Sequence, residues 1–153
     1  MAYVYSKLSR KQQAKKYYEL ALKYHPHDIE LLIEFAVYLE TVEIKESLKV
    51  YAKIIKLAES DPEIQVKPEL YNNYAVTLIR NKKLDEAEKY LIKAEETNTE
   101  NDLVLKYFTL FNRGIYYEEK FQFAEAEKKY LELTSLNTLL PGKFMLNQSL
   151  YFV

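Results

Sequence analysis

Apolar and polar residues follow one another along this chain with the period of an amphipathic helix. In residues 12–24 the apolar side chains stand at positions 14, 17, 18, 21 and 22, which places them on one face of a helix. The same pattern predicts further helices over residues 29–39, 46–57, 69–80, 84–96, 103–120 and 123–136, with another starting near residue 144. Helices of this length with short connections between them predict an all-α fold.

The connections contain residues that end or begin helices. His25-Pro26-His27-Asp28 follows the first segment, and the Asp28 carboxylate can accept hydrogen bonds from the free amides of the next helix. Pro62 marks a second boundary, because proline suits a first helical turn. The polar residues 98–102 and the Pro141-Gly142 pair separate the later segments.

A short motif recurs in successive helix pairs. Each full copy has a small residue in its first helix and, in its second helix, a small residue four positions before an aromatic residue or leucine. The copies are Leu32-x2-Phe35-Ala36-x2-Leu39 with Ser47-x3-Tyr51, Tyr71-x2-Tyr74-Ala75-x2-Leu78 with Ala87-x3-Leu91, and Leu110-x2-Arg113-Gly114-x2-Tyr117 with Ala126-x3-Tyr130; a truncated first copy keeps Ala14-x3-Tyr18.

The motif has a physical reason. A small residue allows two helices to cross closely, and a large ring fills the space between one pair and the next. We therefore expect the packing between helices to depend on Ala14, Tyr18, Ala36, Ser47, Tyr51, Ala75, Ala87, Leu91, Gly114, Ala126 and Tyr130.

The copies resemble tetratricopeptide repeats (TPR), in which helix pairs recur about every 34 residues. Ala14 and Ser47 are 33 residues apart, whereas Ser47 to Ala87 is 40 and Ala87 to Ala126 is 39. The resemblance implies an all-α TPR superhelix, a right-handed solenoid of antiparallel helix pairs with about three and a half irregular repeats. It predicts one array over residues 1–153, with repeats at 1–27, 28–61, 68–101 and 102–138 and a partial repeat at 141–153. The extra residues fall in 61–67 and in the helix that begins near residue 102.

The composition of the chain excludes some classes of partner. The chain has 153 residues, 48% of them hydrophobic and 29% charged, with 22 basic and 23 acidic residues and a net charge of −1. This balance gives no electrostatic footprint for nucleic acid. No apolar run is long enough to span a bilayer, so we expect neither a membrane nor a nucleic-acid partner.

Nothing in the sequence indicates catalysis. There is no cysteine, and only two glycines are present, too few to favour a loop that cradles phosphates. His25 and His27 have only Asp28 beside them, short of the three or four ligands of a zinc site. We therefore expect no enzyme activity, no cofactor, no metal and no small-molecule substrate.

A more specific resemblance covers nearly the whole chain. It is to the Ctr-type TPR scaffold subunits of the RNA polymerase II-associated factor (Paf) complex. The residues that carry it are the segments around 14–40 and 46–51, the junction Val66-x-Pro68-Glu69-Leu70-Tyr71-Asn72-Asn73, and the segments 84–91 and 116–130. The resemblance implies a nuclear scaffold that binds other Paf subunits during transcription elongation on chromatin.

The first helix of each TPR pair lines the concave face of the solenoid, which is where partners bind. In this chain that register places there Ile33, Val37, Val76, Ile79, Arg80, Phe108, Phe111 and Ile115. Because these residues are mainly apolar, we expect the face to bind an extended or helical segment with aliphatic anchors.

Three other functions stay open on the sequence alone. One is a scaffold for RNA processing of the related half-TPR type, although the chain has no tryptophan. Another is an adaptor for chaperones, whose clamp of lysine and asparagine is represented only by Asn73. The third is a regulatory TPR domain of an enzyme.

Neither end of the array has an evident polar capping helix, which solenoids need for solubility. We therefore predict that the sequence is a fragment of a longer solenoid. We also predict that its C-terminal residues, rich in leucine and phenylalanine, either fold back on the preceding repeat or pack on a second copy.

Overall fold

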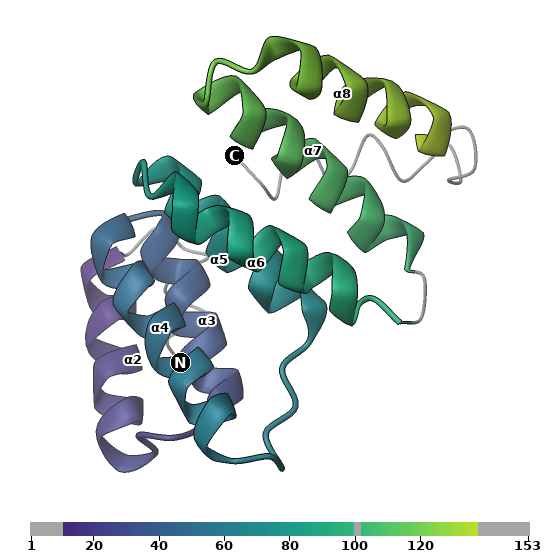
Figure 1. Cartoon of the computed structure of the whole chain (residues 1–153). Helices are drawn as coiled ribbons and strands as arrows, with labels where there is room; N and C mark the ends of the chain where they lie inside the picture. Colours follow the sequence, from purple (N-terminus) through teal and green to yellow (C-terminus); the bar gives the residue numbers. More distant parts are fainter. Residues whose placement is uncertain (1–10, 100–101, 138–153) are drawn as a thin grey trace. The chain divides into compact units, whose positions relative to one another are not determined.

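The computed structural model describes residues 11–99 and 102–137. Every regular element in these residues is an α-helix: α2 (Lys11–Tyr24), α3 (Ile29–Glu40), α4 (Ile44–Ser60), α5 (Pro68–Arg80), α6 (Leu84–Thr97), α7 (Leu103–Glu119) and α8 (Phe123–Asn137) (Figure 1). The all-α prediction is therefore confirmed. The helix expected near residue 144 and the partial repeat at 141–153 lie outside the described residues.

The helix boundaries follow the predicted ones closely, and the exceptions have a physical reason. The Asp28 carboxylate accepts from the Leu31 amide at 3.0 Å and begins α3 as expected. Asp102 caps α7 in the same way, by accepting from the Val104 and Leu105 amides. Helix α4 begins two residues earlier and ends three later than residues 46–57. At its C-terminal end, the polar Glu59 and Ser60 extend the helix without adding apolar residues to the pattern.

The two predicted insertions lie in different kinds of structure. Residues 61–67 form a loop between α4 and α5. The other insertion lengthens α7, which has 17 residues, whereas α3 has 12 and α5 has 13. The chain divides into two compact units, residues 1–70 (unit 1) and residues 71–153 (unit 2). That residues 1–153 form one array stays a prediction.

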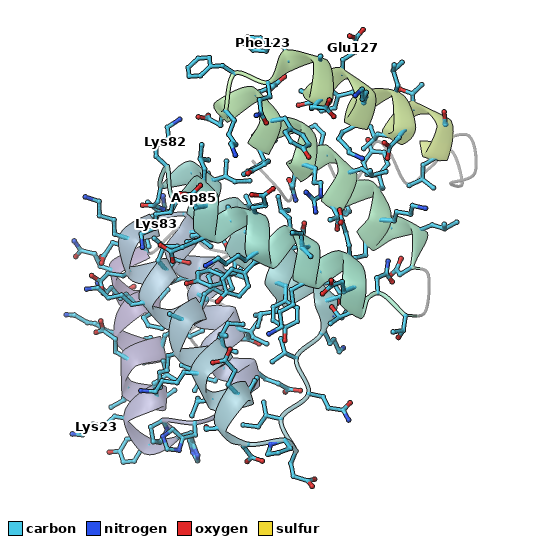
Figure 2. The ribbon with its side chains drawn as sticks, viewed as in Figure 1. Lys23, Lys82, Lys83, Asp85, Phe123 and Glu127 are labelled. Atoms are coloured by element: carbon cyan, nitrogen blue, oxygen red, sulfur yellow. The ribbon has the colours of Figure 1, made fainter. Side chains whose placement is uncertain are left out.

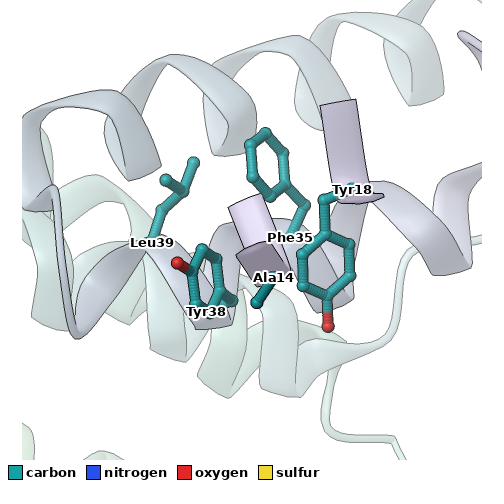
Figure 3. Packing of buried hydrophobic residues seen from close by; sticks show 5 residues of the cluster. All are labelled: Ala14, Tyr18, Phe35, Tyr38 and Leu39. Carbon is teal, nitrogen blue, oxygen red and sulfur yellow. The ribbon is translucent and has the colours of Figure 1, made fainter. Parts of the chain in front are cut away.

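In unit 1 an aromatic cluster joins α2 to α3. The Tyr18 ring lies 5.3 Å from the Phe35 ring and 5.4 Å from the Tyr38 ring, between centroids, and Ala14 and Leu39 complete the cluster (Figure 3). The Tyr38 hydroxyl donates to the Lys11 carbonyl, so the polar end of the ring is satisfied. The cluster explains why α2 packs on α3 through alanine and tyrosine.

In unit 2, tyrosines join α5 to α6, and α7 packs on both α6 and α8. The Tyr90 ring lies 4.6 Å from the Tyr74 ring and 6.4 Å from the Tyr71 ring. The turns α5–α6 and α7–α8 contain Lys82 at φ 60° and Phe121 at φ 58°, a left-handed conformation that glycine adopts most easily. Lys82 and Lys83 lie in the first of these turns, just before Asp85 (Figure 2).

Candidate partner-binding surface

The eight residues predicted for the partner-binding face fall in both units. In unit 1, Ile33 and Val37 stand one turn apart on α3; Ile33 is half-buried and Val37 is 44% exposed. In unit 2, Val76 on α5 is half-buried and Arg80, at the end of the same helix, is exposed. Ile79 requires a correction: its side chain is only 4% exposed, because it packs within the protein, and it is not available to a partner.

The remaining three residues form an apolar row on α7, which we call the α7 stripe: Phe108, Phe111 and Ile115. Their spacing of three and four residues places them on one face of the helix. Phe108 and Ile115 are half-buried, whereas Phe111 is 41% exposed. One part of the Phe111 ring packs against the Tyr130 ring of α8, with 6.3 Å between centroids. The stripe thus contains a large ring that packs on α8 with one part and has a substantial part in solvent.

Glu118 lies near one end of this stripe and is bound to Tyr130. The Tyr130 hydroxyl donates to the Glu118 carboxylate, and burial, with the nearby Glu118 charge and this hydrogen bond, raises the pKa of Tyr130 to about 12. Helices α3 and α4 of unit 1 repeat the arrangement, because the Tyr51 hydroxyl donates to Glu40 and burial beside that carboxylate raises the pKa of Tyr51. In each case a carboxylate in the first helix orients the ring that packs from the second.

These tyrosines predict a loss of stability at high pH. The pKa of Tyr74 is also raised to about 12, first by burial and then by Tyr90 and Glu86. A folded-state pKa above the unfolded value of about 10 means that the stabilisation is complete below pH 10 and is lost as the pH rises through 12. We expect the free energy of unfolding, measured by urea denaturation, to fall over this range, and to fall less steeply in Tyr130→Phe. An identical slope in the variant and the parent would contradict the assignment.

The predicted packing residues lie in the interior. Ten of the eleven are buried, and Tyr130 is half-buried: the buried ones are Ala14, Tyr18, Ala36, Ser47, Tyr51, Ala75, Ala87, Leu91, Gly114 and Ala126. Two contacts show the closeness of the crossings. The Ser47 hydroxyl donates to the Ala36 carbonyl at 2.9 Å, and a Cβ built on Gly114 would lie 2.2 Å from Cε1 of Tyr130.

Sequence reasoning missed two buried polar contacts in unit 2. Arg113 is 9% exposed, and its guanidinium donates to both carboxylate oxygens of Glu95, at 2.7 Å and 2.9 Å. The Asn112 side chain donates to the Asn72 side chain at 3.0 Å, and both are buried. The only available signal was the presence of polar residues beside the small residue of the motif, at Asn112 and Arg113.

The Arg113–Glu95 pair supplies a stability prediction. Glu95→Ala leaves a buried guanidinium without its carboxylate. Water can partly replace the carboxylate because Glu95 is partly exposed, so we expect the free energy of unfolding to fall by about 1–3 kcal/mol and no more. Glu96→Ala is the control: Glu96 is the exposed neighbour of Glu95, and its loss should cost less than about 0.5 kcal/mol. Chemical denaturation of the two variants measures both, and equal losses would contradict a special role for Glu95.

The described residues contain few features that indicate other chemistry. Among them, no three histidine, cysteine or acidic side chains are placed to hold a metal ion. In the same residues no helix has the length and apolar character to cross a bilayer. A polar hollow in unit 2 is lined by Lys106, Lys129 and Glu132, but Lys129 is paired with Glu132 at 2.8 Å.

A family model for the tetratricopeptide repeat matches residues 1–28 and residues 68–101. These two segments are similar to tetratricopeptide repeats. The second contains the complete α5–α6 pair, and the first contains α2. The match supports the TPR family, and the all-helical fold agrees with an all-α TPR helical solenoid. Tetratricopeptide repeats in general take part in protein–protein interaction.

Proposed function

We propose that this chain is a non-catalytic scaffold that binds a segment of another protein at the α7 stripe. The observation that carries the proposal is the Phe111 ring, which is 41% exposed and packs with one part against the Tyr130 ring. A partly exposed aromatic ring with apolar neighbours is a common anchor of a protein interface. Together with TPR-like sequence in the chain, it favours a binding function over a purely structural one.

The charges around the stripe favour an apolar partner. The three residues of the stripe carry no charge, and the nearby residues toward the end of α7 include the acidic Glu118 and Glu119. An acidic C-terminal tail would meet these carboxylates, whereas a segment with aliphatic side chains would bury its apolar surface against the stripe. We therefore propose an extended or helical segment with aliphatic anchors as the partner.

For the biological context we propose the Paf complex, with other Paf subunits as partners, a nuclear location and a role in transcription elongation on chromatin. The support is the sequence resemblance, most of all in the two long junctions and in the Pro68-Glu69-Leu70-x-Asn72-Asn73 segment. The open alternatives are a half-TPR scaffold for RNA processing, a chaperone adaptor and the regulatory domain of an enzyme.

Co-purification with defined partners tests this context. The tagged chain is mixed separately with purified Paf subunits, with a chaperone that has an acidic C-terminal tail, and with subunits of an RNA-processing complex of the kind that half-TPR scaffolds hold. We expect retention of at least one Paf subunit and of neither other partner. Retention of the chaperone alone, or of the RNA-processing protein alone, would replace the Paf proposal with the corresponding alternative.

A further inference from the structure

A hollow lined by residues of α7 and α8 adjoins the α7 stripe. Its volume is about 310 Å³, and Tyr130, which packs against Phe111 of the stripe, is one of its lining residues. Glu118 lines it from α7 and follows Phe111 by seven residues, or about two helical turns. Because the Tyr130 ring borders both the stripe and the hollow, a segment that binds the stripe can also place a side chain in the hollow.

The lining of the hollow combines carboxylates with aromatic and aliphatic surface. Glu118 and Glu127 are both exposed, and Phe123 and Leu131 are 65% and 61% exposed. Phe123 and Glu127 stand one turn apart on α8 (Figure 2). Among the described residues, the two charged side chains that line the hollow are therefore both acidic. Such a lining suits a cation on an apolar stem, because aromatic rings and carboxylates both attract an ammonium group.

The neighbouring lysines of α8 bind carboxylates elsewhere. Lys128 pairs with Glu125 at 2.7 Å, and Lys129 pairs with Glu132 at 2.8 Å. Neither lysine lines the hollow. The charge of the hollow is therefore negative, which is complementary to a basic side chain and repels an acidic one.

The preceding repeat packs without this combination of a carboxylate and two rings. Shifted by the 39 residues that separate the repeats, Glu118, Phe123 and Tyr130 correspond to Ile79, Leu84 and Leu91. Ile79 and Leu91 are buried, so aliphatic side chains are sufficient for packing there. The carboxylate and the rings at the hollow therefore indicate a role in addition to packing.

We propose that the hollow binds a lysine side chain of the partner segment, an inference that rests on the proposed binding of that segment at the α7 stripe. The four-carbon stem of the lysine lies against the Phe123 and Tyr130 rings. The ammonium group has three donors and bonds to the carboxylates of Glu118 and Glu127. Glu118 can keep its bond from the Tyr130 hydroxyl, because a carboxylate has two acceptor oxygens. The partner is thus a segment with aliphatic anchors and a nearby lysine.

Titration of the full chain with designed segments tests this assignment. Two synthetic helical segments carry leucine anchors and one lysine, placed seven residues before the central leucine in one and seven residues after it in the other, to match Phe111 and Glu118. A second form of each has norleucine in place of lysine, which keeps the stem and removes the charge. By calorimetry, we expect one of the two segments to bind about three- to tenfold more tightly in its lysine form.

Two variants that remove one charge each locate the effect on the protein. Glu127→Gln keeps the size of the side chain and should reduce the preference for lysine to less than about twofold. Glu132→Gln is the control and should keep the preference, because Glu132 is also on α8 but lines a different hollow. Circular dichroism of both variants monitors the fold.

The same titrations separate this inference from the proposed function. Equal binding of the lysine and norleucine forms, with both weakened by Phe111→Ala, would overturn the inference and support the stripe. A preference for lysine that Glu127→Gln removes, in segments that Phe111→Ala leaves unaffected, would support the hollow and contradict the stripe. Equal losses of the preference in Glu127→Gln and Glu132→Gln, or no binding of any segment, would also overturn the inference.

Discussion

Gly114→Ala is expected to destabilise the protein, although alanine is the better helix former. The added Cβ would lie 2.2 Å from Cε1 and 2.5 Å from Cζ of Tyr130, so the ring must move away from α7. The ring is also bound to Glu118 through its hydroxyl, which limits where it can go. Overpacking of this kind costs about 1–3 kcal/mol, more than the helix propensity of about 1 kcal/mol that alanine would add at most.

A second substitution separates this cause from a general effect of the mutation. The preceding repeat has Ala75 and Leu91 at the positions of Gly114 and Tyr130, and both are fully buried. We therefore expect Gly114→Ala combined with Tyr130→Leu to be more stable than the sum of the single variants predicts, by about 0.5–3 kcal/mol. Urea denaturation of the four proteins measures this coupling. Additive losses, or a Gly114→Ala variant more stable than the parent, would show that the ring does not limit this position.

Phe111→Ala is expected to have the largest effect on partner binding. Removing a central aromatic anchor from an interface can cost about 2–4 kcal/mol, roughly a 30- to 1000-fold rise in Kd. Helicity should change little, because 41% of the side chain is already exposed. Phe121→Ala is the matched control: this phenylalanine is 80% exposed and lies in the α7–α8 turn, outside the stripe. Arg80→Ala should weaken binding less, because an exposed charge mainly affects association rate and salt dependence.

Calorimetric titration of the parent and the three variants with a Paf subunit segment measures these differences, and circular dichroism monitors the fold. If Phe121→Ala weakened binding as much as Phe111→Ala, the α7 stripe would not be the binding surface. If Phe111→Ala melted the helices, the ring would be a packing residue, and Phe108→Ala would have to show the loss of binding in its place.

Helix positions and the buried face of each helix could be predicted from the sequence because both follow from the spacing of apolar residues. The motif predicted close helix crossings at Ala36 and Ser47, and the Ser47 hydroxyl donates to the Ala36 carbonyl. It placed the Tyr130 ring between one helix pair and the next, whereas the ring packs against Gly114 and Phe111 in the first helix of its own pair. The burial of the Ile79 side chain could not be predicted from this spacing. It occupies the same position of the motif as Glu40 and Glu118, which bind tyrosines, but Leu91 replaces the tyrosine in its repeat and Ile79 packs as an apolar side chain.

The left-handed turn residues were also beyond the sequence pattern. Lys82 and Phe121 have positive φ. Glycine is the residue that would have indicated a left-handed turn at these positions in the sequence. Their amides and those of the next residues instead donate to the ends of α5 and α7, with Lys83 bonded to the Leu78 carbonyl and Gln122 to the Tyr117 carbonyl at 3.0 Å and 2.9 Å. The hydrogen bonds that close each turn hold a conformation that the residue type does not favour.

The central claim is that the chain binds an apolar protein segment at the α7 stripe, and one competition titration tests it most directly. The full chain is titrated with a Paf subunit segment that has aliphatic anchors and, in parallel, with an acidic chaperone tail, each at low and at moderate salt. We predict that the aliphatic segment binds, changes little with salt and is weakened at least 30-fold by Phe111→Ala. Tight binding of the acidic tail that moderate salt abolishes and that Phe111→Ala leaves unchanged would contradict it.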